Sequence, residues 1–256
     1  MPALLTPSAA PLAAPAHLRR LRVELADGAC TSVHVARYRL AATDVRVVRL
    51  RGPLPLAAWC ARNDAPEALV GGFYVRPHGT PLGELRTRGV ERRHVPFDAP
   101  WDEMRACVHV AGGEVTIARR DLIAAQPRGD LLQAGPLLVC DGVVVRGDEE
   151  GFSAGARQFD SDITAGRYPR TALGVSADHL LAVACDGRAD EEAGLSLDEL
   201  AEVLVALGAR HALNLDGGGS SSLVCGGELR NVSRAKHGTE LPGGRAISTA
   251  LLFTQR

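Results

Sequence analysis

The chain has 256 residues, of which 46% are hydrophobic and 23% are charged, a composition that suits one large globular domain and excludes a disordered chain. The formal net charge is −1 and the isoelectric point is about 6.7, so charge does not favour nucleic acid or an anionic membrane as a partner. Aromatic residues make up 4%, too few for a base-stacking platform, and no apolar run reaches the ~18 residues that span a bilayer.

The six cysteines lie at least 30 residues apart, with no Cys-x-x-Cys pair and no cluster with histidine. This spacing does not support a structural zinc site, and we expect free buried thiols and neither metal nor cofactor. The first seventeen residues are rich in proline and lack a basic region typical of a secretory signal. Together these features predict a cytoplasmic protein.

The first half of the chain predicts strands for the most part. Residues 1–20 are expected to be a disordered tail, ahead of a single domain over 21–256. Apolar and polar residues alternate over 21–50, which predicts half-buried strands with a turn at Asp27-Gly28. We further expect a short helix over 54–62 and strands over 68–75, 107–118 and 131–145. Residues 147–170 are polar and without period, which predicts either an exposed loop over a site or a poorly ordered insertion.

The last third contains the clearest helix. Ser196 followed by Glu199 forms a capping box, and leucines at 197, 200, 204 and 207 share one face before Gly208. Strands are expected over 171–175, 179–185, 211–215, 221–224 and 246–253. The predicted fold is therefore an α+β domain built on a mixed β-sheet core with few helices, one of them strong, at about 196–207.

The most informative stretch runs from Ala212 to Val224, with the sequence Ala-Leu-Asn-Leu-Asp-Gly-Gly-Gly-Ser-Ser-Ser-Leu-Val. Alternate residues of a strand share a face, so Asn214 and Asp216 are expected to project together. Three glycines between two strands allow a ligand to approach backbone N–H groups, and three serines follow them. A side-chain amide, a carboxylate, serine hydroxyls and free backbone N–H groups together suit the binding of a sugar or a phosphate ester.

Two other motifs fit poorly. The glycine run lacks the Gly-Lys-Ser/Thr and the following helix of a P-loop. Gly151-Phe152-Ser153-Ala154-Gly155 matches the nucleophile-elbow pattern in letters, but acidic residues precede it where an apolar strand belongs.

The ordered set of motifs resembles the phosphodiester glycosidase family. The residues that carry the resemblance are Gly71-Gly72-Phe73-Tyr74, Gln133-Ala134-Gly135-Pro136, Arg170-Thr171-Ala172-Leu173-Gly174, Asp186-Gly187-Arg188, the helix after Ser196, Asn214 to Ser221, and Gly244-Arg245-Ala246. The resemblance covers about residues 67 to 253 and departs at Val70, where the family usually has asparagine. It implies cleavage of the bond between a sugar anomeric carbon and a phosphodiester oxygen, with a sugar phosphate or glycoconjugate as the small-molecule partner.

That reaction requires a carboxyl group at the anomeric centre, cations for the phosphate and hydrogen-bonding groups for the sugar. Asp216 is the first candidate for nucleophile or general base, and Asp186, at the end of a neighbouring strand, is the second carboxylate. The candidates for binding substrate are Arg170, Arg188 and Arg245 for the phosphate, with Asn214, Gly218, Gly219, Ser220, Ser221 and Gly72 around them.

Two alternatives stay open at this point. Val70 in place of asparagine motivates a sugar- or phosphate-binding module without turnover. A serine esterase would use Ser153 with Asp186 and either His211 or His237. His78 and Glu84 are weaker site candidates, and Asp160 and Asp162 are interpreted as a solvated acidic stretch with no metal.

Overall fold

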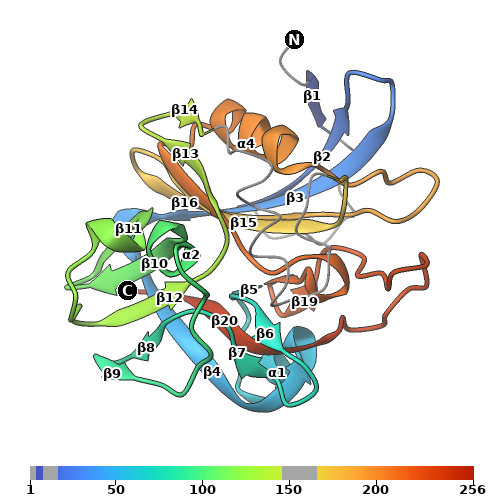
Figure 1. Cartoon of the computed structure of the whole chain (residues 1–256). Coiled ribbons are helices and arrows are strands. Elements are labelled where there is room, and N and C mark those ends of the chain that lie inside the picture. Colours follow the sequence, from blue (N-terminus) through green and yellow to red (C-terminus); the bar gives the residue numbers. More distant parts are fainter. Residues whose placement is uncertain (1–3, 8–16, 146–165) are drawn as a thin grey trace.

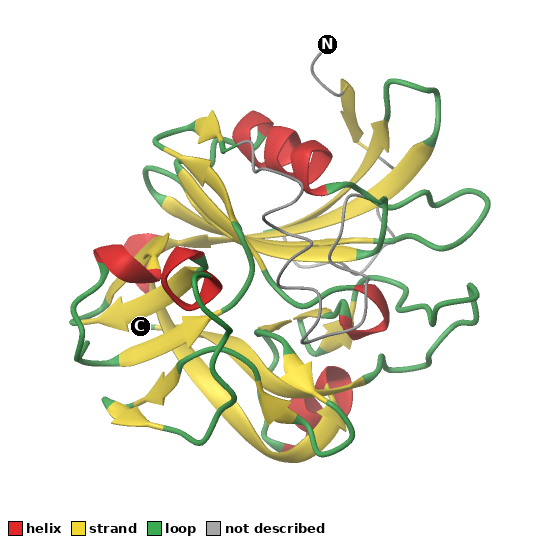
Figure 2. Ribbon diagram, in the orientation of Figure 1, coloured by secondary structure: helices red, strands yellow, loops and turns green. Residues whose placement is uncertain are grey.

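Strands dominate the fold, and the helices are few and short (Figure 2). The structure is a computed structural model that describes residues 4–7, 17–145 and 166–256. Its largest sheet has eight strands in the order β1 (Leu4–Pro7), β2 (Leu18–Glu24), β3 (Cys30–Arg39), β16 (His179–Cys185), β15 (Arg170–Val175), β17 (His211–Asn214), β13 (Leu137–Cys140) and β14 (Val143–Val144).

Two five-stranded sheets lie on the other side of the core (Figure 1). One has the order β19 (Glu228–Leu229), β18 (Leu223–Cys225), β5 (Ala68–Val70), β20 (Ala246–Gln255) and β4 (Thr43–Pro55). The other has the order β11 (Glu114–Arg119), β10 (Ala106–Ala111), β12 (Asp130–Gln133), β8 (Leu85–Thr87) and β9 (Val90–Glu91). A small pair is formed by β6 (Tyr74–Val75) and β7 (Thr80–Pro81).

In the described part of the chain, the helices are α1 (Leu56–Arg62), α2 (Trp101–Met104) and α4 (Leu197–Ala206), and short 3-10 turns occupy Leu40–Ala42, Arg120–Leu122 and Gly218–Ser220. Helix α4 begins where the sequence predicts, because the Ser196 hydroxyl accepts the Glu199 N–H and the Glu199 carboxylate accepts the Ser196 N–H. Gly208 follows the helix with a φ of 90°, which a residue with a side chain adopts at a cost. Figure 1 shows α4 and α1 at opposite ends of the molecule.

The main core lies between the eight-stranded sheet and the two smaller sheets. Leu173 and Leu213 from the large sheet pack in one buried cluster with Leu251, Phe253 and Leu132 from the other two. The opposite face of the large sheet is covered by α4, whose buried leucines pack on β15, β16 and β17. Strands β15, β16 and β17 are therefore buried on both faces of the sheet, and they give the loops at their ends a rigid support.

The prediction of a mixed sheet, with both parallel and antiparallel strands, is wrong. Every pair of these strands in the described part of the chain is antiparallel. Strands β16 and β17 are each antiparallel to β15, which lies between them, so both end at the same edge. Over the described residues the fold is β-rich with few helices, and α4 is the longest of those helices.

The beginning of the chain also differs from the predicted tail. Strand β2 starts at Leu18, three residues before the expected start of the domain, and Leu4–Pro7 pairs with it as β1. All six cysteines are free thiols, and four of them are buried. Within the described residues, no helix has both the length and the apolar character needed to cross a membrane.

Candidate active site

The turn after β17 is fixed by backbone hydrogen bonds to two other segments. The N–H of Asp216 donates to the carbonyl of Gly71 (3.0 Å), just beyond β5. The N–H of Gly218 donates to the carbonyl of Pro169 (2.7 Å), just before β15, and the Thr171 hydroxyl donates to the Asp216 carbonyl (2.5 Å). Asp216 is therefore held where the eight-stranded sheet meets the sheet that contains β5.

Asp216 is a partly buried residue whose carboxyl group is only partly satisfied. Its Oδ1 accepts the N–H of Gly217 (2.8 Å), whereas Oδ2 is buried and has no hydrogen-bond partner among the described residues. Burial raises the pKa of Asp216 to about 6, although the Ser220 side chain, the Gly217 N–H and the charges of Arg245 and Arg76 act to lower it. A carboxyl group with a pKa near neutrality can exchange a proton at the pH at which most enzymes work.

Four buried polar side-chain atoms without hydrogen-bond partners gather within nine residues of sequence. They are Oδ1 of Asn214, Oδ2 of Asp216 and the hydroxyls of Ser221 and Ser222, in the described part of the chain. Buried polar groups in native proteins are nearly always hydrogen-bonded, and leaving one unpaired costs about 1–3 kcal/mol. The segment therefore has unused hydrogen-bonding capacity that a polar ligand or water can satisfy.

Gly219 allows the Arg245 guanidinium to approach this segment. A Cβ atom at position 219 would lie 2.9 Å from Nη2 of Arg245, closer than side chains pack. The Arg245 N–H in turn donates to the Gly219 carbonyl (3.0 Å), which joins the start of β20 to the glycine turn. The missing side chain at position 219 thus leaves room for the guanidinium of Arg245, whose charge acts on Asp216.

The glycine turn uses its amides differently from the sequence prediction. Of the three glycines, Gly218 has a positive φ, of 60°, and its N–H is taken by Pro169. The N–H groups of Ser220 and Ser221 donate to the carbonyls of Gly217 and Gly218, within the 3-10 turn. The expectation that the bend leaves its amides bare for a ligand is therefore wrong for Gly218, because its N–H is used in the bond to the Pro169 carbonyl.

Asn214 and Gly72 hold neighbouring strands together. Asn214 is the last residue of β17, so the alternation that was expected to align it with Asp216 ends there. Its Nδ2 donates to the Leu215 carbonyl (2.8 Å), and its backbone packs on Gly135, where a Cβ atom would lie 2.5 Å from the Asn214 oxygen. The N–H of Gly72 donates to the Thr249 hydroxyl (3.0 Å) on β20.

Asp186 lies at the predicted sheet edge, but its carboxylate is fully engaged. Its Oδ2 lies 3.0 Å from Nε2 of His34 on β3, and its Oδ1 accepts the N–H of Val232 (2.6 Å). The side chain is 3% exposed. With β15 between their strands, the ends that carry Asp186 and Asp216 are separated by two strand spacings, roughly 10 Å.

The other two predicted arginines lie among backbone carbonyls. Arg170 is 1% exposed, and its Nε and Nη2 donate to the carbonyls of Leu195 (3.1 Å) and Gly166 (2.9 Å). Arg188 donates from Nη1 to the Arg234 carbonyl (3.0 Å) and lines a separate hollow of about 440 Å³. Arg76, whose charge acts on Asp216, was missed by sequence reasoning, and its only signal was its place in the loop after Gly71-Gly72.

The weaker candidates are placed as follows. His78 is exposed, and Glu84 forms ion pairs with Arg86 (2.8 Å) and Arg120 (2.6 Å). Val70 is buried in the apolar cluster under α1, so a polar side chain there would face that cluster rather than Asp216. Ser153, Asp160 and Asp162 lie outside the described residues.

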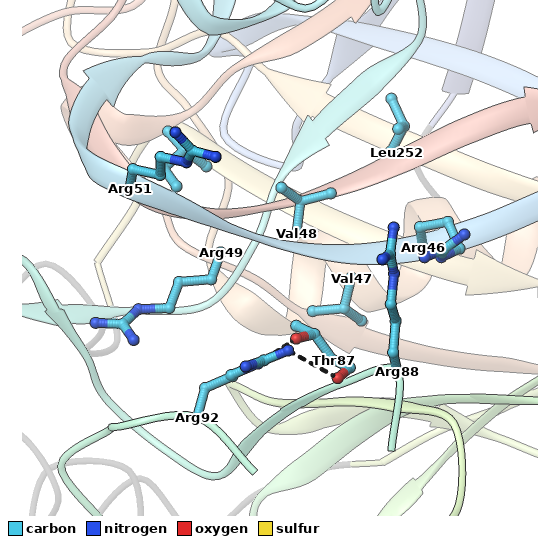
Figure 3. Close-up of a pocket in the computed structure, with 10 residues that line it drawn as sticks. Arg46, Val47, Val48, Arg49, Arg51, Thr87, Arg88, Arg92 and Leu252 are labelled. Carbon is cyan, nitrogen blue, oxygen red and sulfur yellow. Dashed lines mark hydrogen bonds between the residues drawn. The ribbon is translucent and has the colours of Figure 1, made fainter. Parts of the chain in front are cut away.

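A second hollow, of about 730 Å³, lies along β4 and the β8–β9 hairpin and shares no residue with the predicted site (Figure 3). Its charged lining residues are five arginines, Arg46, Arg49, Arg51, Arg88 and Arg92. Figure 3 shows the Arg92 side chain hydrogen-bonded to Thr87.

The same overall fold is found in solved structures of low sequence identity. The catalytic domain of zebrafish N-acetylglucosamine-1-phosphodiester alpha-N-acetylglucosaminidase, auto-inhibited by its pro-peptide, aligns with a TM-score of 0.68 and 18% identity over 100% of this chain and 89% of that one. A hypothetical protein from Synechocystis aligns with a TM-score of 0.63 and 20% identity, over 94% of this chain and 62% of that one, so our chain spans less than two thirds of its length. A protein from Burkholderia pseudomallei described as exported aligns with a TM-score of 0.59 and 16% identity, over 88% of this chain and 74% of that one.

Among curated proteins no sequence matches this chain. The sequence model of the phosphodiester glycosidase family, however, matches residues 63–254, which is three quarters of the chain and contains the Asp216 turn, Arg245 and the motifs that precede them. The protein therefore belongs to the phosphodiester glycosidase family.

Proposed function

We propose that the protein is a hydrolase that cleaves the bond between the anomeric carbon of a sugar and a phosphodiester oxygen. The observation that supports this proposal most is the carboxyl group of Asp216, which has one buried unpaired oxygen in the described structure and feels the charge of Arg245, a guanidinium for which Gly219 leaves room. A carboxyl group and a cation are the two parts that this reaction requires. Family membership supports the same reaction class.

In the proposed reaction Arg245 binds the phosphodiester and stabilises the negative charge that develops on the departing phosphate oxygen. Asp216 acts at the anomeric carbon, either as the nucleophile or as the base that takes a proton from the attacking water. The C–O bond breaks with its electron pair going to the phosphate, which is a weakly basic leaving group. Asn214, Ser220 and Ser221 supply hydrogen bonds to the substrate.

The pKa of Asp216 sets the expected dependence of the rate on pH. Its carboxyl group is protonated well below about pH 6 and ionised above it. Both proposed roles need the ionised form, so kcat/KM is expected to rise with pH and to level off above about pH 6.

The proposal is tested with a panel of sugar 1-phosphodiesters and, as matched substrates without phosphate, aryl glycosides of the same sugars. We expect release of reducing sugar from at least one phosphodiester, and a larger loss of kcat/KM for that substrate than for the aryl glycoside in Arg245→Ala. Asp141→Asn, at a carboxylate whose side chain is 87% exposed, serves as the control that keeps activity. No turnover of any sugar 1-phosphodiester, or full turnover in Asp216→Asn, would contradict the proposal.

The stereochemistry of the product separates the two roles of Asp216. If the first-formed sugar, observed by NMR, has the configuration of the substrate, the carboxylate is the nucleophile; if it is inverted, the carboxylate is the base.

A further inference from the structure

Side chains from four distant segments converge beside the Cys225 thiol. His17 lies just before β2, Tyr38 on β3, Glu67 just before β5 and Cys225 at the end of β18. Nε2 of His17 lies 3.2 Å from Oε2 of Glu67 and 3.2 Å from Sγ of Cys225. The ligand atoms of His17, Glu67 and Cys225 all lie within 4.8 Å of one another.

The arrangement resembles ligands that surround one metal ion more than it resembles a proton relay. In a cysteine–histidine–acid relay the thiol and the acid contact opposite nitrogens of the imidazole. Here a single nitrogen, Nε2, faces both the thiol and the carboxylate. Ligand atoms bound to tetrahedral zinc at 2.0–2.3 Å lie roughly 3.3–3.8 Å apart. The two separations from His17 Nε2, both 3.2 Å, are close to that range.

The surrounding residues hold the carboxylate in place. Oε1 of Glu67 accepts the N–H of Gly226 (2.8 Å), and Oε2 accepts the hydroxyl of Tyr38 (2.6 Å). The Tyr38 ring is itself fixed by stacking on Phe253, with centroids 4.5 Å apart. Such outer contacts orient metal ligands and strengthen their binding.

The cluster is buried on one side and open on the other. Cys225 is fully buried, whereas the side chains of Glu67 and His17 are 17% and 35% exposed. Arg230, whose charge acts on Cys225, donates to the Cys225 carbonyl and pairs with Glu228 (2.8 Å). A thiolate and a carboxylate would outweigh that single charge.

We propose that His17, Glu67 and Cys225 bind one divalent transition metal ion, with an open coordination position toward solvent. The donor set of one imidazole nitrogen, one carboxylate oxygen and one thiolate matches zinc. None of the three residues belongs to the Asp216 site, so this proposal does not depend on the proposed hydrolysis. Burial raises the pKa of the Cys225 thiol to about 12 in the protein without metal, so binding displaces a proton from sulfur.

A second group, Cys140, Asp141 and His211, provides a matched control. Its separations are longer, with 3.6 Å between His211 Nε2 and Asp141 Oδ1 and 3.9 Å between Cys140 Sγ and Asp141 Oδ2. The Asp141 side chain is 87% exposed and sits in a hairpin turn, so nothing holds these ligands against water.

The test is a titration of chelator-treated full-length protein with Co²⁺, which reports tetrahedral coordination and thiolate ligation by its absorption bands, followed by competition with Zn²⁺. We expect one equivalent to bind with a thiolate-to-cobalt band, and Cys225→Ser to lose that band while Cys140→Ser keeps it. His17→Ala, at a partly exposed position that should fold normally, is expected to weaken binding at least about 100-fold, because even outer-shell changes cost 10–100-fold.

Zinc content after dialysis and the thermal shift caused by Zn²⁺ give readouts independent of cobalt and of enzymatic activity. Wild-type binding that survives in both Cys225→Ser and His17→Ala would overturn the proposal. So would loss of binding in Cys140→Ser alone, or absence of any thiolate band.

Discussion

Two aspartates follow strands β16 and β17, which lie on either side of β15 and end at the same sheet edge, and the two side chains have opposite environments. The carboxylate of Asp186 is paired on both oxygens, by His34 and by the N–H of Val232. Asp216 has one oxygen paired by Gly217 and the other buried without a partner among the described residues. Both follow a buried strand and precede a glycine, so local sequence does not distinguish them.

The difference shows how position in a fold decides the role of a side chain. A buried carboxylate with both oxygens satisfied stabilises the structure and has little capacity left for a substrate. A buried carboxylate with an unpaired oxygen is unfavourable for stability, and its raised pKa is typical of a functional group. We therefore propose that Asp186 serves the structure and Asp216 the chemistry, and three predictions test that division.

The largest expected effect is on turnover in Asp216→Asn. The substitution keeps the shape of the side chain and removes the ionisable oxygen, so kcat should fall about 10³–10⁴-fold, or about 4–5.5 kcal/mol of activation free energy. Asp186→Asn should retain kcat within a few-fold per folded molecule. Steady-state kinetics with the preferred sugar 1-phosphodiester measures both, and the reverse pattern would exchange the two roles.

The next largest effect is on the stability of Asp186→Ala. Removing this carboxylate leaves the buried His34 ring and the Val232 N–H without their acceptor, which should lower the free energy of unfolding by about 3–5 kcal/mol. Asp178→Ala, at an acid whose side chain is 74% exposed and pairs with His179, should lose less than about 1 kcal/mol. Urea unfolding measures both; a stable but inactive Asp186→Ala would contradict the structural role.

The third prediction concerns the dependence of stability on pH. The folded-state pKa of Asp216, about 6, lies above its unfolded value, so the folded state binds more protons between about pH 4 and pH 6 and loses stability as pH rises through that range. Asp216→Asn lacks this loss. The free energy of unfolding of the variant relative to wild type should thus grow by about 2–3 kcal/mol between about pH 4 and pH 7.

Urea unfolding of both proteins over that pH range provides the measurement. Repeating it at high salt is the control, because a shift caused by burial is screened far less than one caused by surface charge. A difference that stays constant with pH would show that Asp216 is solvated in the folded protein.

Local sequence was sufficient for elements whose determinants lie close together in the chain. The alternating pattern places β2, β3 and β4, and the capping box at Ser196 defines the start of α4. The glycine-serine motif likewise locates the turn after β17. In each case the stabilising partners are within a few residues, so they are visible in the sequence.

The sequence did not allow us to predict which distant segments of the chain pair with one another. The antiparallel arrangement depends on the sheet order, which periodicity does not encode, and the partner of Asp186 is 152 residues away. The proposed metal ligands at 17, 67 and 225 show no spacing motif, because they meet only when two sheets pack. The glycine run also does not reveal what each glycine is for. Gly219, for example, leaves room for the Arg245 guanidinium, which the sequence does not show.

The smallest predicted effect tests that last contact. In Gly219→Ala the new Cβ atom would lie 2.9 Å from Nη2 and 3.0 Å from Cζ of Arg245, so the guanidinium must move away from the turn. We expect kcat/KM for the phosphodiester to fall about 10-fold, or about 1.4 kcal/mol, while the Asp216 carboxyl stays in place. Gly52→Ala, where no atom lies within 4 Å of the added Cβ, is the matched control. Because the guanidinium sits at the end of a flexible side chain, the displacement should affect phosphate-bearing substrates and leave aryl glycosides unchanged; an equal loss with both substrates would mean that the glycine supports the turn rather than the cation.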